Sequence, residues 1–131
     1  MQHPIFHVIA AAPQPVAPYS HAVEAAGWVQ LTGQIPNHPE DAAKPFPAGI
    51  EAQTRRVMDN LALVLREIGL GFEHVIAARV FLTHFERDYA TMNAAYAAYF
   101  PPDRLPARTC VGVAALALGA LVEIDLIARR P

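Results

Sequence analysis

The segment 121–129 constrains the fold of this chain most, because apolar side chains occur in both of its alternating sets. Successive side chains of a β-strand point to opposite faces of the sheet. One set contains Val122, Ile124, Leu126 and Ala128, and the other contains Leu121, Glu123, Asp125 and Ile127. Apolar residues in both sets are typical of a strand that is covered on both faces.

The rest of the chain predicts strands that alternate with two helices. The expected strand segments are rich in β-branched and aromatic residues, whereas the expected helices repeat apolar residues every three to four positions. We expect strands at about 21–26, 28–32, 75–83, 107–114 and 121–129, and helices at about 48–68 and 86–100. This β-β-α-β-α-β-β order, to which a further N-terminal strand can be added, predicts an α+β fold with one sheet covered on one face by two helices.

Two helices can cover only one face of such a sheet, so the second face requires another cover. A length of 131 residues suits one domain, and we expect residues 1–131 to form a single domain. Hydrophobic residues make up 53% of the chain and charged residues 17%, which is apolar for a soluble monomer. Other copies of the chain are therefore the expected cover for the second face.

Charge and hydropathy exclude several classes of partner. The formal net charge is −2 and the sequence has no basic stripe, so we expect neither nucleic acid nor a membrane surface as a partner. Beyond the N-terminal region, the longest uncharged apolar run, 110–122, is too short to span a bilayer. Residues 1–23 lack a basic n-region and contain several prolines, so we expect no signal peptide. The single cysteine, Cys110, fits a reducing compartment, and we expect a cytoplasmic protein.

The sequence contains no familiar motif for a metal or a cofactor. It lacks the glycine-rich nucleotide-binding motifs, the serine nucleophile elbow and the zinc-protease helix motif. Its six histidines are scattered without ligand spacing, so we expect no metal site and no cofactor. Cys110 could form a nucleophilic pair with a histidine, but a lone cysteine on an apolar strand is more often a small core residue.

Arg108 interrupts an otherwise apolar strand segment. By strand alternation, Arg108 and Cys110 point to the same face. A guanidinium in such a place needs a carboxylate, either in the protein or on a ligand. Glu123 or Asp125 on a neighbouring strand could be the protein carboxylate, and structural ion pairs of this kind are more common than ligand-binding sites. The planar fork of arginine could instead grip a ligand carboxylate through two parallel hydrogen bonds.

Polar residues also occur at two strand ends and in the second helix. The segments 18–20 and 32–36 are two such clusters, and taken alone they are typical of turn chemistry. Asn93, within the second expected helix, could likewise be an ordinary solvated residue. None of these features by itself indicates a site.

Taken together, these motifs resemble the RidA/YjgF family of enamine/imine deaminases. The resemblance covers nearly the whole chain, which makes it far more specific than any single motif. It includes segments 17–23, 31–36, 53–61, 80–82, 92–93, 106–111 and 121–124, together with Tyr96, Tyr99 and Phe100. The resemblance implies one mixed sheet with two helices on one face, assembled as a homotrimer with a central β-barrel and with sites in clefts between subunits.

The resemblance also implies roles for particular residues. Arg108 would bind the substrate carboxylate, the Cys110 backbone would hold the imine nitrogen or the attacking water, and Glu123 would position or polarise that water. Pocket-lining roles, some from the adjacent subunit, would fall to Tyr19, Thr32, Gly33 and Asn93. An imine carbon is already electrophilic, so oriented water could hydrolyse it to a 2-oxo acid and ammonia without metal or cofactor.

The chain departs from the family pattern at a few positions, and other functions stay open. Ala17 replaces the usual glycine, Thr32 stands where serine is commoner, and 116–119 lacks a proline and a basic residue. These departures leave the substrate preference open. The alternatives are a dedicated catabolic deaminase of an aminomuconate-like acid and a non-catalytic member of the same fold. Such a member would bind small metabolites or act as a chaperone or ribonuclease-like protein.

Overall fold

The structure is a computed structural model that describes residues 3–131, and it contains one sheet and two α-helices. The strands are β1 (Ile5–His7), β2 (Ala22–Ala25), β3 (Trp28–Gln34), β4 (Val75–Leu82), β5 (Ala107–Gly112) and β6 (Val122–Arg129). The helices are α1 (Ile50–Glu67) and α2 (Phe85–Ala97), with 3-10 turns at Phe72–His74 and Ala117–Gly119. Every strand and helix expected from the sequence is present, and β1 is the additional N-terminal strand.

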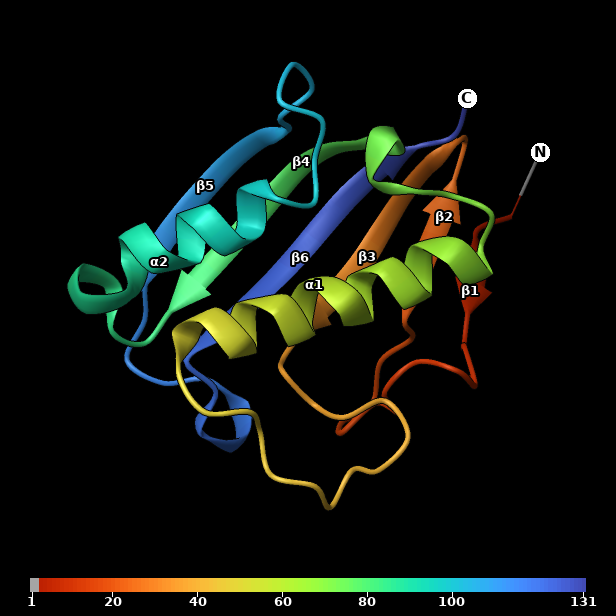
Figure 1. Cartoon of the computed structure of the whole chain (residues 1–131). Helices are drawn as coiled ribbons and strands as arrows, with labels where there is room; N and C mark the ends of the chain where they lie inside the picture. Colours follow the sequence, from red (N-terminus) through yellow and green to blue (C-terminus); the bar gives the residue numbers. More distant parts are fainter. Residues whose placement is uncertain (1–2) are drawn as a thin grey trace.

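The six strands form a single mixed sheet in the order β1-β2-β3-β6-β4-β5. All neighbours are antiparallel except β4 and β5, which are parallel. Both helices lie on the same face of the sheet, with α1 across its centre and α2 beside it towards β5 (Figure 1). The predicted α+β architecture is therefore confirmed. The strand order also leaves β5, which carries Arg108, at one edge of the sheet.

The core lies between α1, α2 and the inner face of the sheet. In β6, the set that begins at Val122 and ends at Ala128 faces this core and is buried. The apolar stripe of α1 packs against it through Val57, Met58, Leu61, Val64 and Leu65. Truncation of one such buried leucine to alanine typically costs about 2–5 kcal/mol.

The opposite face of the sheet has no cover within residues 3–131 of one chain. Phe6 is 66% exposed and Trp28 is 52% exposed on this open face. A hollow of about 390 Å³ lies beside Trp28 and is also lined by Val23 and Ile127. The open face therefore carries apolar side chains, and one of them, Ile127, belongs to the second alternating set of segment 121–129.

The end of one helix and the end of one strand differ from the sequence prediction. The helix α2 ends at Ala97. The backbone amides of Tyr99 and Phe100 donate hydrogen bonds to the carbonyls three residues earlier, as in a 3-10 turn, and not to those four residues earlier. The strand β5 ends at Gly112, where the next amide bonds the Leu82 carbonyl. Within the described residues, neither helix has the length and apolar character that a bilayer crossing requires.

Candidate active site

Arg108 lies on the helix-covered face of the sheet, next to α2. Val80 of β4 pairs with Cys110 on one side and with the core residue Ile124 on the other, so Cys110 and Arg108 share the inner face. The Arg108 guanidinium carbon is 5.1 Å from the centre of the Tyr96 ring and 5.8 Å from that of Tyr89. Its Nη2 donates a long hydrogen bond of 3.4 Å to the Tyr89 hydroxyl. Two tyrosine rings therefore support this cation.

A cavity of about 290 Å³ opens beside the Arg108 side chain. It is lined by Asn93, Tyr96, Ala97, Leu105, Pro106 and Arg108. No carboxylate within residues 3–131 forms an ion pair with Arg108. A cation in a cavity with apolar walls and without an internal partner can receive a small anionic ligand.

The alternative of an Arg108 ion pair with Glu123 or Asp125 is wrong. Asp125 is paired with Arg79, its direct neighbour on β4, through bonds of 2.7 Å and 3.0 Å. Strand β4 separates β5 from β6, and both acids of β6 lie on the open face, whereas Arg108 lies under α2. The strand order therefore removes both carboxylates from reach of Arg108.

Glu123 lies on the open face, against the backbone of Gly33. A β-carbon built at Gly33 would lie 2.4 Å from Oε2 of Glu123, so a hydrogen atom is all that fits there. Burial raises the pKa of the Glu123 carboxyl, and the nearby Asp125 raises it further, whereas Arg79 opposes both effects. This half-buried carboxylate is therefore a stronger proton acceptor than an ordinary glutamate.

Gly33 and Thr32 occupy a β-bulge in β3. Leu31 pairs with Leu126 and Gln34 pairs with Ile124, so two residues of β3 stand opposite Asp125 alone. Bulges of this kind are frequent next to functional sites, where they redirect side chains. Here the bulge brings the Gly33 backbone against Glu123.

Tyr19 lies in the segment that is attached to this bulge. The Thr32 hydroxyl donates to the Ser20 carbonyl at 2.6 Å, and the Thr32 amide donates to the His21 carbonyl. Tyr19 itself is 40% exposed, and its hydroxyl accepts a hydrogen bond from the Val16 amide. The exposed ring is therefore available to a ligand or to another copy of the chain.

The predicted site residues thus divide into two groups within one chain. The Arg108 group, on the inner face, consists of Arg108, Asn93 and Cys110. The Glu123 group, at the bulge and the open face, consists of Glu123, Gly33, Thr32 and Tyr19. The Cys110 thiol is partly buried, and burial raises its pKa, which disfavours the thiolate and a nucleophilic role.

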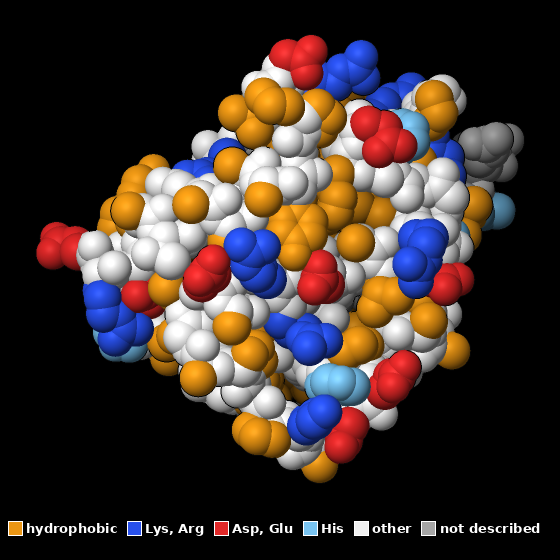
Figure 2. All heavy atoms as spheres, in the orientation of Figure 1, with side chains coloured by type: hydrophobic (Ala, Val, Ile, Leu, Met, Phe, Trp, Pro, Cys, Tyr) orange, Lys and Arg blue, Asp and Glu red, His pale blue; other side chains and the backbone are white. Residues whose placement is uncertain are grey.

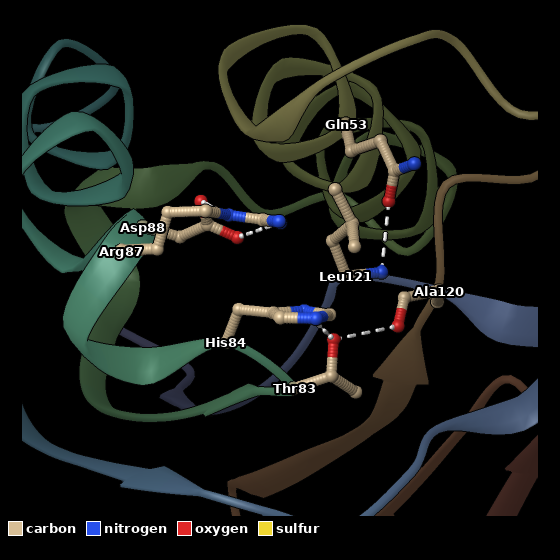
Figure 3. A network of polar contacts seen from close by, with 7 residues as sticks. All are labelled: Gln53, Thr83, His84, Arg87, Asp88, Ala120 and Leu121. Atoms are coloured by element: carbon tan, nitrogen blue, oxygen red, sulfur yellow. Dashed lines mark hydrogen bonds and ion pairs between the residues drawn. The ribbon is translucent and has the colours of Figure 1, made fainter.

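A polar network lies between the first turn of α1 and the segments that lead into α2 and β6 (Figure 3). The Leu121 amide donates to Oε1 of Gln53 in α1 at 2.9 Å, and the Thr83 amide donates to the Leu121 carbonyl. The Thr83 hydroxyl also donates to the Ala120 carbonyl. The segments that precede α2 and β6 are thereby joined to each other and to α1, and Leu121 lies two residues before Glu123.

Two aromatic residues of this region were not predicted as site residues. The sequence places Tyr89 and Tyr96 on one side of the second helix, which is also the pattern of an ordinary core contact. Only the strand order shows that this side of α2 meets Arg108. Among residues 3–131, no group of three or more potential metal ligands comes together.

Comparison with known proteins identifies the family. The family model described as endoribonuclease L-PSP matches residues 9–130. A RutC family protein of Synechocystis is 42% identical over 93% of both chains. The 2-iminobutanoate/2-iminopropanoate deaminase of Escherichia coli is 35% identical over 91% of this chain and 92% of its own. The chain belongs to the RidA/YjgF family, as its motifs indicated.

Solved structures agree with this assignment. The YjgF gene product of E. coli has a TM-score of 0.87 at 32% identity, covering 97% of this chain and 99% of that one. The structure of E. coli TdcF with bound serine has a TM-score of 0.87 at 31% identity, with the same coverage. The sheet with two helices on one face is therefore the fold of the family.

Proposed function

We propose that this protein is a hydrolytic deaminase of reactive 2-imino and enamine acids such as 2-iminobutyrate and 2-aminoacrylate. The observation that carries the proposal is the Arg108 guanidinium, which lines a small cavity and has no carboxylate partner within residues 3–131. A 2-imino acid supplies the missing carboxylate. The identity with a named imine deaminase over nearly the full length supports the same chemistry.

The proposed site combines two subunits of a homotrimer with a central β-barrel. In one chain Arg108 and Glu123 lie on opposite faces of the sheet, so one substrate can meet both only in a cleft between copies. Two features favour such a cleft. Strand β5 is an edge strand, and the open face exposes apolar side chains that a neighbouring subunit would cover.

Within such a cleft the residues would act as follows. Arg108 holds the carboxylate, and the Cys110 backbone orients the imine nitrogen or the water. Glu123 of the adjacent subunit accepts a proton as water adds to the imine carbon. This addition gives a carbinolamine. Glu123 then returns the proton to the carbinolamine nitrogen, the C–N bond breaks with its electron pair leaving on nitrogen as ammonia, and the remaining hydroxyl loses its proton to become the carbonyl of the 2-oxo acid. An enamine enters the same path after protonation at carbon.

The proposal also covers cofactors, cellular compartment, domain organisation and the class of partner. It requires neither metal nor cofactor, and it assigns the chain to the cytoplasm as a single domain over residues 1–131. Acidic and basic side chains alternate over the helix-covered face in Figure 2, and no basic stripe crosses this face. That pattern favours a small-molecule substrate over nucleic acid.

The test is ammonia release from enzymatically generated 2-aminoacrylate and 2-iminobutyrate, measured before and after extensive chelation. We expect acceleration by the parent chain, with or without chelator, and by the control variant Arg66→Ala on the exposed side of α1. Aminomuconate, run in parallel, distinguishes a dedicated catabolic enzyme from a general imine deaminase. A parent chain that binds 2-oxobutyrate but accelerates none of these reactions would instead be a metabolite-binding member of the family.

A further inference from the structure

Two residues that line the cavity beside Arg108 each carry a buried polar atom without a hydrogen-bond partner. The Asn93 Oδ1 atom and the Tyr96 hydroxyl are both buried, and neither forms a hydrogen bond within residues 3–131. The Tyr96 residue is 4% exposed. Both residues line the same cavity as Arg108. Three polar residues of α2 and β5 thus line one cavity. The Arg108 guanidinium forms a long hydrogen bond to Tyr89, whereas the Asn93 Oδ1 atom and the Tyr96 hydroxyl form none within residues 3–131.

Such an arrangement is costly unless another molecule completes it. A buried hydroxyl without a hydrogen bond destabilises a protein by about 1–3 kcal/mol. A purely structural tyrosine at this position could be a phenylalanine, because the ring already packs against Phe100 and beneath the Arg108 cation. The hydroxyl therefore needs an explanation that ring packing does not supply.

We infer that the Tyr96 hydroxyl is a substrate-binding group, which donates a hydrogen bond to the carboxylate that Arg108 holds. This inference rests on the proposed function and extends it to a residue of α2. The guanidinium carbon lies 5.1 Å from the centre of the Tyr96 ring, so a carboxylate held by Arg108 would lie beside this residue. Asn93, one turn earlier on α2, would contact the polar atoms on carbon 2 of the same ligand.

The protonation state of Tyr96 suits this role. Burial raises the pKa of the Tyr96 hydroxyl to about 12, against the opposing influence of Arg108. The hydroxyl stays protonated at every pH at which the protein is expected to work, and so it remains a donor. The apolar walls at Ala97, Leu105 and Pro106 would then receive the carbon side chain of the substrate.

The decisive variant is Tyr96→Phe, tested in the full-length protein for deamination kinetics, 2-oxobutyrate binding by calorimetry, and thermal unfolding. A hydrogen bond to a charged group is worth enough to change affinity about 10- to 100-fold. We expect KM and the Kd for 2-oxobutyrate to rise by that factor, with kcat changed little. The Tm should be unchanged or higher, because the variant no longer buries an unpaired hydroxyl.

The matched control is Tyr99→Phe. The Tyr99 hydroxyl donates a hydrogen bond of 2.8 Å to the Asp59 carboxylate, and neither residue lines the cavity. This variant should lose stability and keep its KM, which is the reverse of the Tyr96→Phe result. Asn93→Ala provides a second, independent variant, and we expect weaker 2-oxobutyrate binding without a loss of Tm.

Three outcomes would contradict the inference. A Tyr96→Phe protein with parental KM and Kd would show that the hydroxyl does not touch the ligand. A fall in Tm or in oligomer mass would show that it has a structural partner in the assembly. Absence of saturable 2-oxobutyrate binding by the parent would overturn both this inference and the proposed site. If Tyr96→Phe weakens 2-oxobutyrate binding but the parent releases no ammonia, the deaminase proposal alone fails.

Discussion

The carboxylate of Glu123 and the backbone of Gly33 are in direct contact across β6 and β3. A β-carbon at Gly33 would lie 2.4 Å from Oε2 and 3.0 Å from Cδ of Glu123. Gly33 belongs to the bulge opposite Asp125, so the extra residue of β3 is what creates this close approach. The position of the proposed base therefore depends on a residue that has no side chain of its own.

Substitution of this glycine tests the relationship. Gly33→Ala should displace Glu123, because side-chain atoms fill the space that the methyl group needs. We expect kcat to fall about tenfold or more, the loss typical of a misplaced catalytic group. The Tm should change by only a few degrees. Adding Glu123→Ala to the Gly33→Ala variant should relieve the clash. The effects of the two substitutions on the free energy of unfolding should therefore not add up in a double-mutant cycle, and this result would verify the contact.

Glu123→Gln tests the proposed base. We expect kcat to fall about 10- to 10³-fold with KM nearly unchanged. Burial raises the folded-state pKa of this carboxyl, so the folded protein disfavours the charged form and loses stability as the pH rises through that pKa. The glutamine variant should therefore be as stable as the parent at neutral pH, or more so. A fully active variant would remove Glu123 from the site.

The pH dependence of the parent enzyme follows from the same shift. Protonation of Glu123 should abolish its action, so kcat should fall as the pH is lowered through a pKa above the ordinary glutamate value of 4.5. The pH–rate profile of Glu123→Gln should lack this acidic limb. The same acidic limb in both proteins would assign it to another group.

Arg108→Ala tests the carboxylate anchor. Two charge-assisted hydrogen bonds contribute on the order of 3 kcal/mol, so kcat/KM should fall at least about 10²-fold. Arg108→Lys keeps the charge but loses the planar fork, and should recover a minor part of the activity. Both proteins should stay folded and assembled, because within residues 3–131 Arg108 forms no ion pair whose carboxylate its loss would leave unpaired. A folded Arg108→Ala protein with parental activity would contradict the mechanism.

Light scattering tests the assembly. At micromolar concentration we expect the mass of a trimer of the 14.2 kDa chain. A charge introduced on the open face at Trp28, which is 52% exposed in the single chain, should weaken that trimer and lower activity with it. A monomeric mass for the active parent protein would contradict a site between subunits.

Acid stability should depend on Glu24. Hydrogen bonds from Arg130, at 2.7 Å, lower the pKa of this carboxyl to about 2, with a further contribution from His7 and against the effect of burial. A depressed pKa means that the stabilisation is present above pH 4.5 and is lost as the pH falls towards 2. With allowance for the partly exposed Arg130, it amounts to roughly 1–3 kcal/mol. Unfolding free energies of Glu24→Gln should vary less over this pH range than those of the parent.

Local patterns in the sequence were sufficient to predict the elements and their faces. The alternation in 121–129 correctly placed Val122 and Ala128 on one face of the strand and Glu123 and Asp125 on the other. The same alternation placed Arg108 and Cys110 on one face of their strand. These features follow from the repeat of two residues per strand pleat, which requires no knowledge of the partner strands.

The tertiary structure alone decided which groups meet. Strand β6 enters the sheet between β3 and β4 and leaves β5 outside, so Asp125 meets Arg79, whereas Arg108 meets Tyr89 and Tyr96. The bulge that brings Gly33 against Glu123 likewise appears only once β3 is aligned with β6. Strand order and register arise from contacts between segments far apart in the chain, and a local repeat carries no information about them. The sequence therefore determined which face each side chain occupies within its strand, and long-range pairing determined its neighbours.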